Sequence, residues 1–422
     1  MQMSKPLLPI DYLCIEIANS YGKDSNGFKG DKDTFDNRIN WVKQNINNLE
    51  ALSETANEDV PQYIKAVMAL RQVQEGKPTG ASVTLDATCS GLQILSALTG
   101  CVKGARITNL LEDDVRYDAY TVITGTLNKF LLEDGLEDLT TSRAKAKDAV
   151  MTALYGSKAT PREIFQLNEV INAFYDACFT EAEGAFTMLD KMLKAWQPYQ
   201  LNHHWTLPDG HIAHVNVIEK EEIRPRIELP AYDIDHRFTT SIKENIGTKT
   251  GVSLPANITH SVDAYLLRCI IRRCSYNPKT VKTALELMGE IAFNEDAMPN
   301  KTIDNLINQF DKTNMIDAVW FQVINKDTAE TVPDDIRERL VHLSNMMLSS
   351  KPFSVLTVHD AFRVHFNNAN ALRFHYKEIM AELAESTLLN SILTEITGKK
   401  TVIKKLSKGL GKRIRESIYP IC

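Results

Sequence analysis

The spacing of hydrophobic residues predicts a mostly helical chain. Within residues 36–74, Ile39, Val42, Ile46 and Leu49 recur at helical intervals, and a second helical segment starts at Pro61. The same kind of pattern predicts helices over further ranges: 90–98, 113–132, from Ser142 onward, 161–197, 261–273 and 281–350.

Strands are fewer, and two of them end on a carboxylate. Residues 82–86 and 353–359 are rich in β-formers and run into Asp86 and Asp360. Residues 363–366 can return as the hairpin partner of the second strand. Residues 205–217 alternate around Pro-Asp-Gly and predict another hairpin. Helix therefore clearly outweighs strand.

Composition narrows the class of protein. A chain of 422 residues allows two or three domains, and 43% hydrophobic with 24% charged residues is ordinary globular usage. The sequence contains no apolar run of about 20 residues and no secretory leader pattern, which predicts no membrane association. The seven cysteines are scattered, as expected for a reduced protein with inert thiols.

The charge is unevenly distributed. Residues 399–415 carry eight Lys or Arg and no acidic residue, although the formal net charge of the chain is −6. A basic segment on an acidic chain is typical of binding to a polyanion, and a solvated lysine-rich helix end explains it about equally well.

The carboxylates that end the two strands suggest a metal site. A rigid sheet can hold Asp86 and Asp360 close together, and their mutual repulsion then favours cations between them. Hard oxygen ligands indicate magnesium, and two such ions are the usual device for in-line phosphoryl transfer. Two unrelated turn-capping aspartates are the commoner explanation for any such pair.

Four residues at four-residue intervals form a second candidate site. On a helix, Arg143, Lys147, Met151 and Tyr155 would make a stripe about 18 Å long, with cations at one end and a flat ring at the other. Such a stripe suits a nucleotide, and Gly156 would permit a close approach. An amphipathic helix with Met and Tyr in the core is the simpler alternative.

Several segments, in order, resemble the phage-type single-subunit DNA-dependent RNA polymerases, which include T-seven-like and mitochondrial enzymes. The resemblance spans residues 82–422 and rests on these segments: Leu-Asp86-Ala-Thr-Cys-Ser-Gly-Leu-Gln, Gly104-Ala-Arg-Ile-Thr-Asn-Leu-Leu, Arg143 through Lys158, Trp205-Thr-Leu-Pro-Asp-Gly, Asn257-Ile-Thr-His260-Ser-Val-Asp, Val358-His-Asp360-Ala-Phe and the end around Glu416-Ser-Ile-Tyr.

The resemblance implies an α+β, right-hand polymerase core, helix-rich with a small antiparallel palm sheet. The palm would comprise residues 1–102 and 261–422 around fingers at 103–260, with a helical insertion near 275–350 and a basic C-terminal segment. The insertion is longer than the family leads us to expect.

The family's chemistry carries over to individual positions. Asp86 and Asp360, with Ala87 beside them, would hold two magnesium ions for template-directed addition of ribonucleotides. The triphosphate would contact Arg143 and Lys147, with Lys147 also able to protonate the leaving pyrophosphate. Met151, Tyr155 and Gly156 would contact the nucleotide, with Tyr155 selecting ribose.

Three assignments are weaker. His260 would approach the nascent pair, and Lys32, in a loosely matching segment, would contact phosphate or else be a solvated loop lysine. His359 is expected to orient Asp360 or pack the strand rather than bind metal. Ala87 and Ala361 replace the Gly and Ser of better-known members.

The resemblance also predicts partners. Segments that the family places before the first palm motif are not found, as in the larger subunit of a heterodimeric N-four-type RNA polymerase II, where a smaller polypeptide supplies that half. We therefore expect DNA template, RNA product, ribonucleoside triphosphates and this second subunit as partners, with room for a DNA-loading accessory protein. The expected location is the cytoplasm of an infected bacterial host.

Three rival functions remain. A related family A-like DNA polymerase would usually carry a glutamate soon after its first aspartate, whereas no acidic residue lies between Asp86 and Glu112. A non-catalytic DNA-binding polymerase-like subunit would be marked by loss of Asp86 or Asp360. A zinc site is a remote alternative, and its ligands would be the histidines at 203, 204, 211 and 214.

Overall fold

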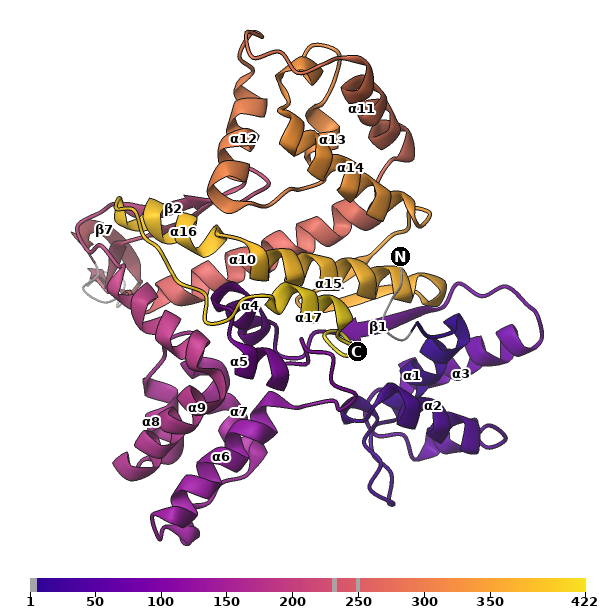
Figure 1. The fold of residues 1–422 in the computed structure, drawn as a ribbon. Helices are drawn as coiled ribbons and strands as arrows, with labels where there is room; N and C mark the ends of the chain where they lie inside the picture. The colour runs from indigo at the N-terminus through magenta and orange to yellow at the C-terminus, as the bar shows by residue number, and fades with distance from the viewer. Residues whose placement is uncertain (1–5, 230–233, 248–250) are drawn as a thin grey trace.

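The computed structural model describes residues 6–229, 234–247 and 251–422 and shows a helix-rich α+β protein (Figure 1). Its helices are α1 (Pro9–Tyr21), α2 (Phe35–Gln44), α3 (Val60–Gln74), α4 (Ser90–Thr99), α5 (Val102–Ile107), α6 (Ala119–Glu133), α7 (Arg143–Ala153), α8 (Ala159–Phe165), α9 (Asn168–Lys194), α10 (Ser253–Cys274), α11 (Pro278–Glu290), α12 (Lys301–Thr313), α13 (Trp320–Val323), α14 (Asp334–Leu348), α15 (Ala369–Glu385), α16 (Leu388–Thr397) and α17 (Leu410–Glu416).

The strands form small antiparallel sheets. A three-stranded sheet has the order β1 (Ser82–Asp86), β9 (Ala361–His365), β8 (Leu356–Val358). The other sheets are two-stranded ribbons, which pair β2 (Asn202–Thr206) with β3 (Ile212–Asn216), β4 (Ile218–Ile223) with β7 (Thr240–Gly247), and β5 (Arg226–Leu229) with β6 (Ile234–Arg237).

The main core joins segments that lie far apart in the sequence. Helices α4, α10 and α15 pack against one another at the centre, and α17 packs along α15 (Figure 1). The three-stranded sheet contributes Val83, Leu85, Phe362 and Val364 to this core, all of them buried. Alternation along β1 therefore turns Thr84 and Asp86 to the opposite face of the sheet.

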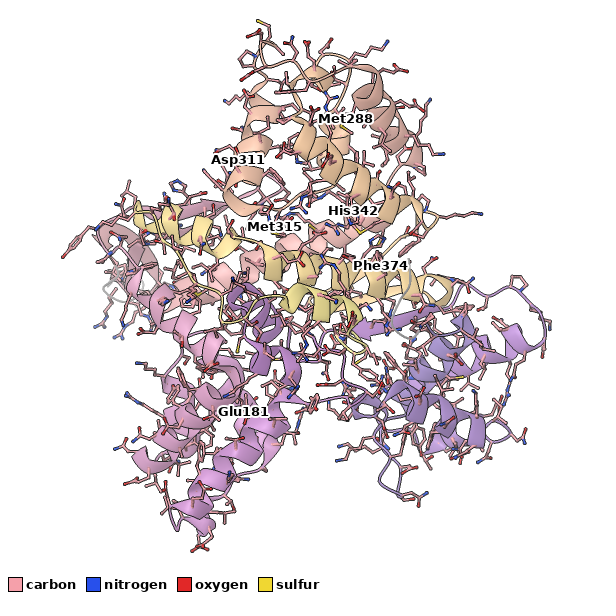
Figure 2. The ribbon with its side chains drawn as sticks, in the orientation of Figure 1. Glu181, Met288, Asp311, Met315, His342 and Phe374 are labelled. Atoms are coloured by element: carbon pink, nitrogen blue, oxygen red, sulfur yellow. The ribbon has the colours of Figure 1, made fainter. Side chains whose placement is uncertain are left out.

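Two groups of helices flank this centre on opposite sides of the view, α1–α3 at right and α6–α9 at lower left (Figure 1). Helix α1 packs on α2 and α3, whereas α6 packs on α9, where the Thr126 hydroxyl donates to Glu181 (2.7 Å; Figure 2). Gly184 of α9 lies so close to α4 that a Cβ there would be 2.4 Å from the Thr99 hydroxyl, so only glycine allows this contact.

Helices α11–α14 form a lobe with a hydrophobic core of its own (Figure 1). Trp320, Leu340 and Met288 belong to this second core, and Phe374 of α15 packs against it from the main body (Figure 2). Arg337 stabilises the lobe from inside, because its guanidinium donates to the backbone carbonyls of Val332, Met288, Ile291 and Ala329.

Many sequence-based elements are confirmed. The strand over 82–86, the helix from Ser90, the hairpin around Pro208-Asp-Gly210 and the return strand at 363–366 are all present. Ser142 caps α7 as expected, since its hydroxyl accepts a hydrogen bond from the Lys145 N–H.

Other predicted boundaries were wrong for local reasons. The helix predicted from 113 begins at Ala119, because the Asp118 carboxylate caps it by accepting from the Thr121 N–H (2.8 Å). The helical region 161–197 breaks at Gln166, which has φ +62°. The strand predicted from 353 begins only at Leu356, since the Phe353 N–H bonds to the Cys274 carbonyl (2.8 Å) at the end of α10.

Candidate active site

The three-stranded sheet brings the two predicted strand-end carboxylates together. Asp86 is paired in register with Ala361, the residue after Asp360, and the Ala87 N–H donates to the Asp360 carbonyl (3.2 Å). The two carboxylates therefore come from adjacent strands at the same end of the sheet, as the sequence predicted.

This end of the sheet opens into a cavity of about 660 Å³. Asp86, Ala87 and Asp360 line it together with Lys32, Arg143, Lys147 and Met151. Seven of the ten predicted site residues thus share one cavity, although they come from the N-terminal region, the central sheet and α7.

Electrostatics at the carboxylates favour a bound cation. Desolvation in the cavity wall, followed by repulsion from Asp360, raises the pKa of Asp86 to about 6, although Lys32 and Arg116 act against the rise. Asp86 still has substantial contact with solvent, so the carboxyl group is accessible to an ion.

The ligands available here suit magnesium, which substrate phosphates help to bind, better than a metal ion that is bound by protein side chains alone. Among the residues that the structure describes, no group of three or more His, Cys, Asp or Glu side chains is arranged to hold a metal. Magnesium is commonly bound by one or two carboxylates and substrate phosphates, and two strand-end carboxylates beside the Ala87 backbone fit that pattern. The Ala87 carbonyl already accepts from the Cys89 N–H (3.1 Å) and has one lone pair left.

The cations of α7 face the cavity through contacts that the sequence did not reveal. Asp118 accepts two hydrogen bonds from Arg143, from Nε (3.0 Å) and from Nη2 (2.5 Å). The Tyr120 ring lies under both cations, 5.5 Å from the Arg143 guanidinium carbon and 5.8 Å from the Lys147 Nζ. The sequence offered a single signal for these two contact residues, which is the spacing of Asp118 and Tyr120 at the start of α6.

Lys32 reaches the same region from the short 3₁₀ turn Gly30–Lys32. Its Nζ lies 2.8 Å from the Asp31 carboxylate and 4.0 Å from that of Asp118. The lysine is therefore placed with Arg143 around a single acid and is not an isolated loop residue.

Tyr155 lies beyond the cavity, against α4. Its hydroxyl approaches Gly91 so closely that a Cβ there would be 2.7 Å away, and its ring centroid is 4.9 Å from that of His260. Burial, followed by the nearby Cys89 and Asp263, raises the pKa of Tyr155 to about 12, so the hydroxyl keeps its proton at neutral pH.

Gly156 and His260 both lie outside this cavity. Gly156 has φ +88°, which explains the glycine, whereas a Cβ there would meet protein atoms only at ordinary distances of 3.5 Å or more. His260 is exposed and lines a smaller cavity of about 360 Å³ with Trp205 and His214. The predicted stripe along α7 is thus divided between two parts of the surface.

The zinc alternative finds no support among the described residues, none of which form a metal-binding histidine cluster. His203 is buried and its Nε2 accepts from the Gln197 N–H (3.1 Å), whereas its neighbour His204 is paired across the ribbon with His214. His359 is exposed, in a tight turn with φ +53° between β8 and β9, so it does not pack into the strand.

The cysteines are all free, as predicted. Burial raises the pKa of Cys14 to about 11 and that of Cys274 to about 12, so both thiols are inert. Cys422 differs, because Arg116 and Arg38 lower its pKa against the effect of burial.

Among the described residues, no helix is long and apolar enough to span a membrane.

The basic segment is ordered and only partly available to a ligand. Arg413 pairs with Glu112, and Arg415 pairs with Glu378 and Glu385. Lys405 is anchored by donating to the Leu98 carbonyl (2.8 Å). The lysines that face solvent are Lys399, Lys400, Lys404, Lys408 and Lys412.

Comparison with known proteins gives one family. Residues 9–195 match the model of a family described as DNA-dependent RNA polymerase. The chain is 22% identical over 342 residues to the DNA-directed RNA polymerase of Pseudomonas phage phiKMV, a match that covers 68% of this chain and 41% of the phage protein.

Fungal relatives match over shorter stretches. A probable DNA-directed RNA polymerase of Neurospora crassa is 31% identical over 170 residues, and the mitochondrial enzyme of Schizosaccharomyces pombe is 27% identical over 172, each covering 36% of this chain. The matches cover 18% and 15% of those two proteins, so the chain spans less than half the length of these relatives. Residues 9–195 therefore resemble the DNA-dependent RNA polymerase family, and the chain is similar to phage and mitochondrial members of that family.

Proposed function

We propose that this chain is the catalytic part of a DNA-dependent RNA polymerase. The observation that carries the proposal is the single cavity in which the carboxylates of Asp86 and Asp360 face the cations of α7. One wall offers ligands for hard cations, and the other offers donors for phosphate. The product would be RNA, made from ribonucleoside triphosphates on a DNA template.

In this proposal the three-stranded sheet is the palm, residues 103–260 are the fingers, and α11–α14 are an insertion in the second part of the palm. The cavity would then lie between the sheet and α7, where a triphosphate bridges the two. The proposed location is the cytoplasm of an infected bacterium, supported by the phage relative.

Two magnesium ions would be held by Asp86 and Asp360, and they would supply charge neutralisation on the triphosphate and activation of the RNA end hydroxyl. Arg143 would bind phosphate oxygens as a planar fork, whereas Lys147 acts as a point charge that can also protonate the departing pyrophosphate. Lys32 would add a third cation, which also lies near Asp118 in the same cavity.

Sugar choice would fall to Tyr155. Its protonated hydroxyl lies at Gly91, close to the start of α4, where it can sense a ribose 2′-hydroxyl. Met151 would contact the nucleotide between Lys147 and Tyr155, since its side chain is exposed and lines the cavity.

A related DNA polymerase is the second candidate, and the structure gives one observation against it. Glu112, the first acidic residue after Asp86, pairs with Arg413 and does not line the cavity. No glutamate that closely follows the first aspartate is therefore available to exclude a 2′-hydroxyl. A non-catalytic subunit has no need for paired carboxylates that face phosphate-binding cations.

Extension of an RNA primer on a DNA template tests the proposal and separates these candidates. With Mg²⁺, the chain, supplied with any second polypeptide that copurifies with it, should add ribonucleotides in preference to deoxynucleotides. A preference for deoxynucleotides would favour the DNA polymerase, and template binding without extension would favour the non-catalytic subunit.

A further inference from the structure

We infer that Asp118 is a positioning residue that sets the Arg143 guanidinium in the orientation in which it receives the triphosphate. The inference rests on the proposed function and adds to it a residue that does not itself contact substrate. Asp118 lies at the point where α6 begins, in the wall of the cavity that also contains Arg143, Lys147 and Lys32.

The contact between the two side chains is a fork. Arg143 uses Nε and Nη2 to bind both carboxylate oxygens, which fixes the plane of the guanidinium as well as its position. An arginine has five N–H donors, and this arrangement uses two of them. The remaining donors on Nη1 and Nη2 are free of Asp118, so the fork leaves capacity for phosphate oxygens while removing rotational freedom.

The carboxylate is itself held rigidly. One of its oxygens accepts from the Thr121 N–H (2.8 Å) and from the Thr121 hydroxyl (3.0 Å), so the N-terminus of α6 fixes its place. Two residues later, the Tyr120 ring lies beneath Arg143 and Lys147. A short segment of α6 therefore orients both cations of α7 at once.

The negative charge of Asp118 has two opposing effects on triphosphate binding. Burial would raise the pKa of Asp118, but hydrogen bonds and charge from Arg143, together with the Thr121 N–H, outweigh it and lower the pKa to about 2. Asp118 is thus an anion at any working pH, and it offsets part of the attraction of Arg143 for phosphate. If orientation dominates, removing the anion weakens triphosphate binding, and if charge offset dominates, removing it strengthens binding.

Asparagine at this position separates the two roles of Asp118. Asp118→Asn keeps an oxygen that can cap α6, because Asn is as good an N-cap as Asp, but it loses the anionic fork to Arg143. Asp190 provides the control for removal of a carboxylate charge, since it is exposed, pairs with Lys194 on α9 and does not line this cavity. Both Asn variants should unfold close to the temperature of the parent.

The first readout needs no catalysis. A fluorescent ribonucleoside triphosphate is titrated with Mg²⁺ into the full 422-residue chain, its Asp118→Asn and Asp118→Glu variants and the Asp190→Asn control, each supplied with any second polypeptide that copurifies with it. We expect Asp118→Asn to weaken binding about tenfold or more, and Asp118→Glu to restore part of the loss. Equal or tighter binding by Asp118→Asn would overturn the inference and leave Asp118 as a counter-ion.

The second readout is primer extension by the active enzyme. Misplacing a substrate-positioning group by about 1 Å can cost 10²-fold in rate, so kcat/KM for nucleotide should fall by about 10- to 100-fold in Asp118→Asn. A parent that binds triphosphate but extends no primer would refute the proposed function, while the binding comparison at Asp118 would still decide the inference. A parent that binds no triphosphate would overturn both.

Discussion

The position of the Tyr155 side chain depends on a neighbouring glycine, Gly91. The Tyr155 hydroxyl would be only 2.7 Å from a Cβ at residue 91, so the glycine at that position allows the tyrosine to reach α4. The four-residue spacing from Arg143 to Tyr155 placed these residues on one helical stretch correctly. It could not show that α7 ends at Ala153, or that Tyr155 is not among the residues that line the cavity with Lys147.

We predict that Tyr155→Phe weakens selection against deoxynucleotides and lowers the rate only modestly. The ring and its contact with His260 remain, and only the group that can sense a 2′-hydroxyl is lost. Primer extension with paired ribo- and deoxynucleotides measures the preference. A variant with the parent's preference would remove Tyr155 from this role.

A second prediction at this scale concerns Gly91. Gly91→Ala places a methyl group 2.7 Å from the Tyr155 hydroxyl and should displace the ring, slowing nucleotide addition about tenfold or more. Adding Tyr155→Phe removes the clashing oxygen, so the double variant should be faster than Gly91→Ala alone. If the rate loss of the double variant equals the product of the losses of the two single variants, the contact between residue 91 and the Tyr155 hydroxyl does not affect nucleotide addition.

At the scale of elements, the connection between α16 and α17 combines anchoring with exposure. Ile403 donates its N–H to Asn390, Leu406 donates its N–H to the Thr99 carbonyl, and Ser407 donates its hydroxyl to the Gly100 carbonyl. Lys400, Lys404 and Lys408 instead face solvent. Composition alone revealed the basic segment, but which cations are neutralised depends on partners outside it, such as Glu112, which pairs with Arg413.

We expect this connection to contact nucleic acid. Changing Lys400, Lys404 and Lys408 together to Gln should reduce the slope of log affinity against log salt by about 2, since each contact with a single-stranded phosphate contributes about 0.7. Filter binding or anisotropy across a salt series measures the slope. Gln at Lys279 and Lys282, exposed on α11, is the control and should leave it unchanged. The same slope in the triple variant would assign the nucleic-acid contacts elsewhere.

The anchor of this connection predicts a pH effect on stability. Burial lowers the pKa of Lys405 to about 8, so the native state binds fewer protons than the unfolded state between about pH 8 and 10.5. The free energy of unfolding should therefore rise across that window relative to a Lys405→Met variant, which cannot titrate. Parallel denaturant titrations at pH 7.5 and 9.5 measure this difference, and a constant difference would contradict the burial of the ammonium group.

The sequence could predict those elements that are determined by residues close to them in the chain. The strand 82–86 and the N-cap Ser142 depend on residues within a few positions and were predicted correctly. Helices α1 and α15 were not predicted, because buried charged residues interrupt their patterns. Arg373 of α15 is one such residue, and it is satisfied only by Tyr12 and the Ile418 carbonyl.

At the scale of the molecule, the described surface includes apolar positions beside the site. In the edge strand β8, next to Asp360, Leu356 and Val358 are 66% and 68% exposed. Helix α3 exposes Val60, Ile64 and Met68 at four-residue intervals. Exposed strand edges and apolar stripes commonly mark protein interfaces.

These surfaces support the expectation of a second polypeptide. We predict that the chain alone is poorly soluble or inactive, and that coexpression with a partner that supplies the remaining polymerase segments yields a one-to-one complex that makes RNA. Size-exclusion chromatography with light scattering, followed by extension assays, measures both points. Unaided initiation by the monomer on duplex promoter DNA would contradict this prediction.

The function proposed for the whole molecule depends on the sheet that brings Asp86 and Asp360 together across a gap of more than 270 residues in the sequence. Removing either charge should eliminate nucleotide addition, because the carboxylates act in the transition state, while binding of template should change little. Asp190→Asn, which removes an exposed acid paired with Lys194 on α9, is the control.

The most direct test is therefore the rate of single-nucleotide addition to a primed DNA template with Mg²⁺, compared among the parent, Asp86→Asn, Asp360→Asn and Asp190→Asn, each supplied with any second polypeptide that copurifies with it. We predict full activity in the parent and in Asp190→Asn, and essentially none in the other two variants, with template affinity preserved in all four. Substantial nucleotide addition by both Asp86→Asn and Asp360→Asn would contradict the assignment of these carboxylates as the catalytic pair.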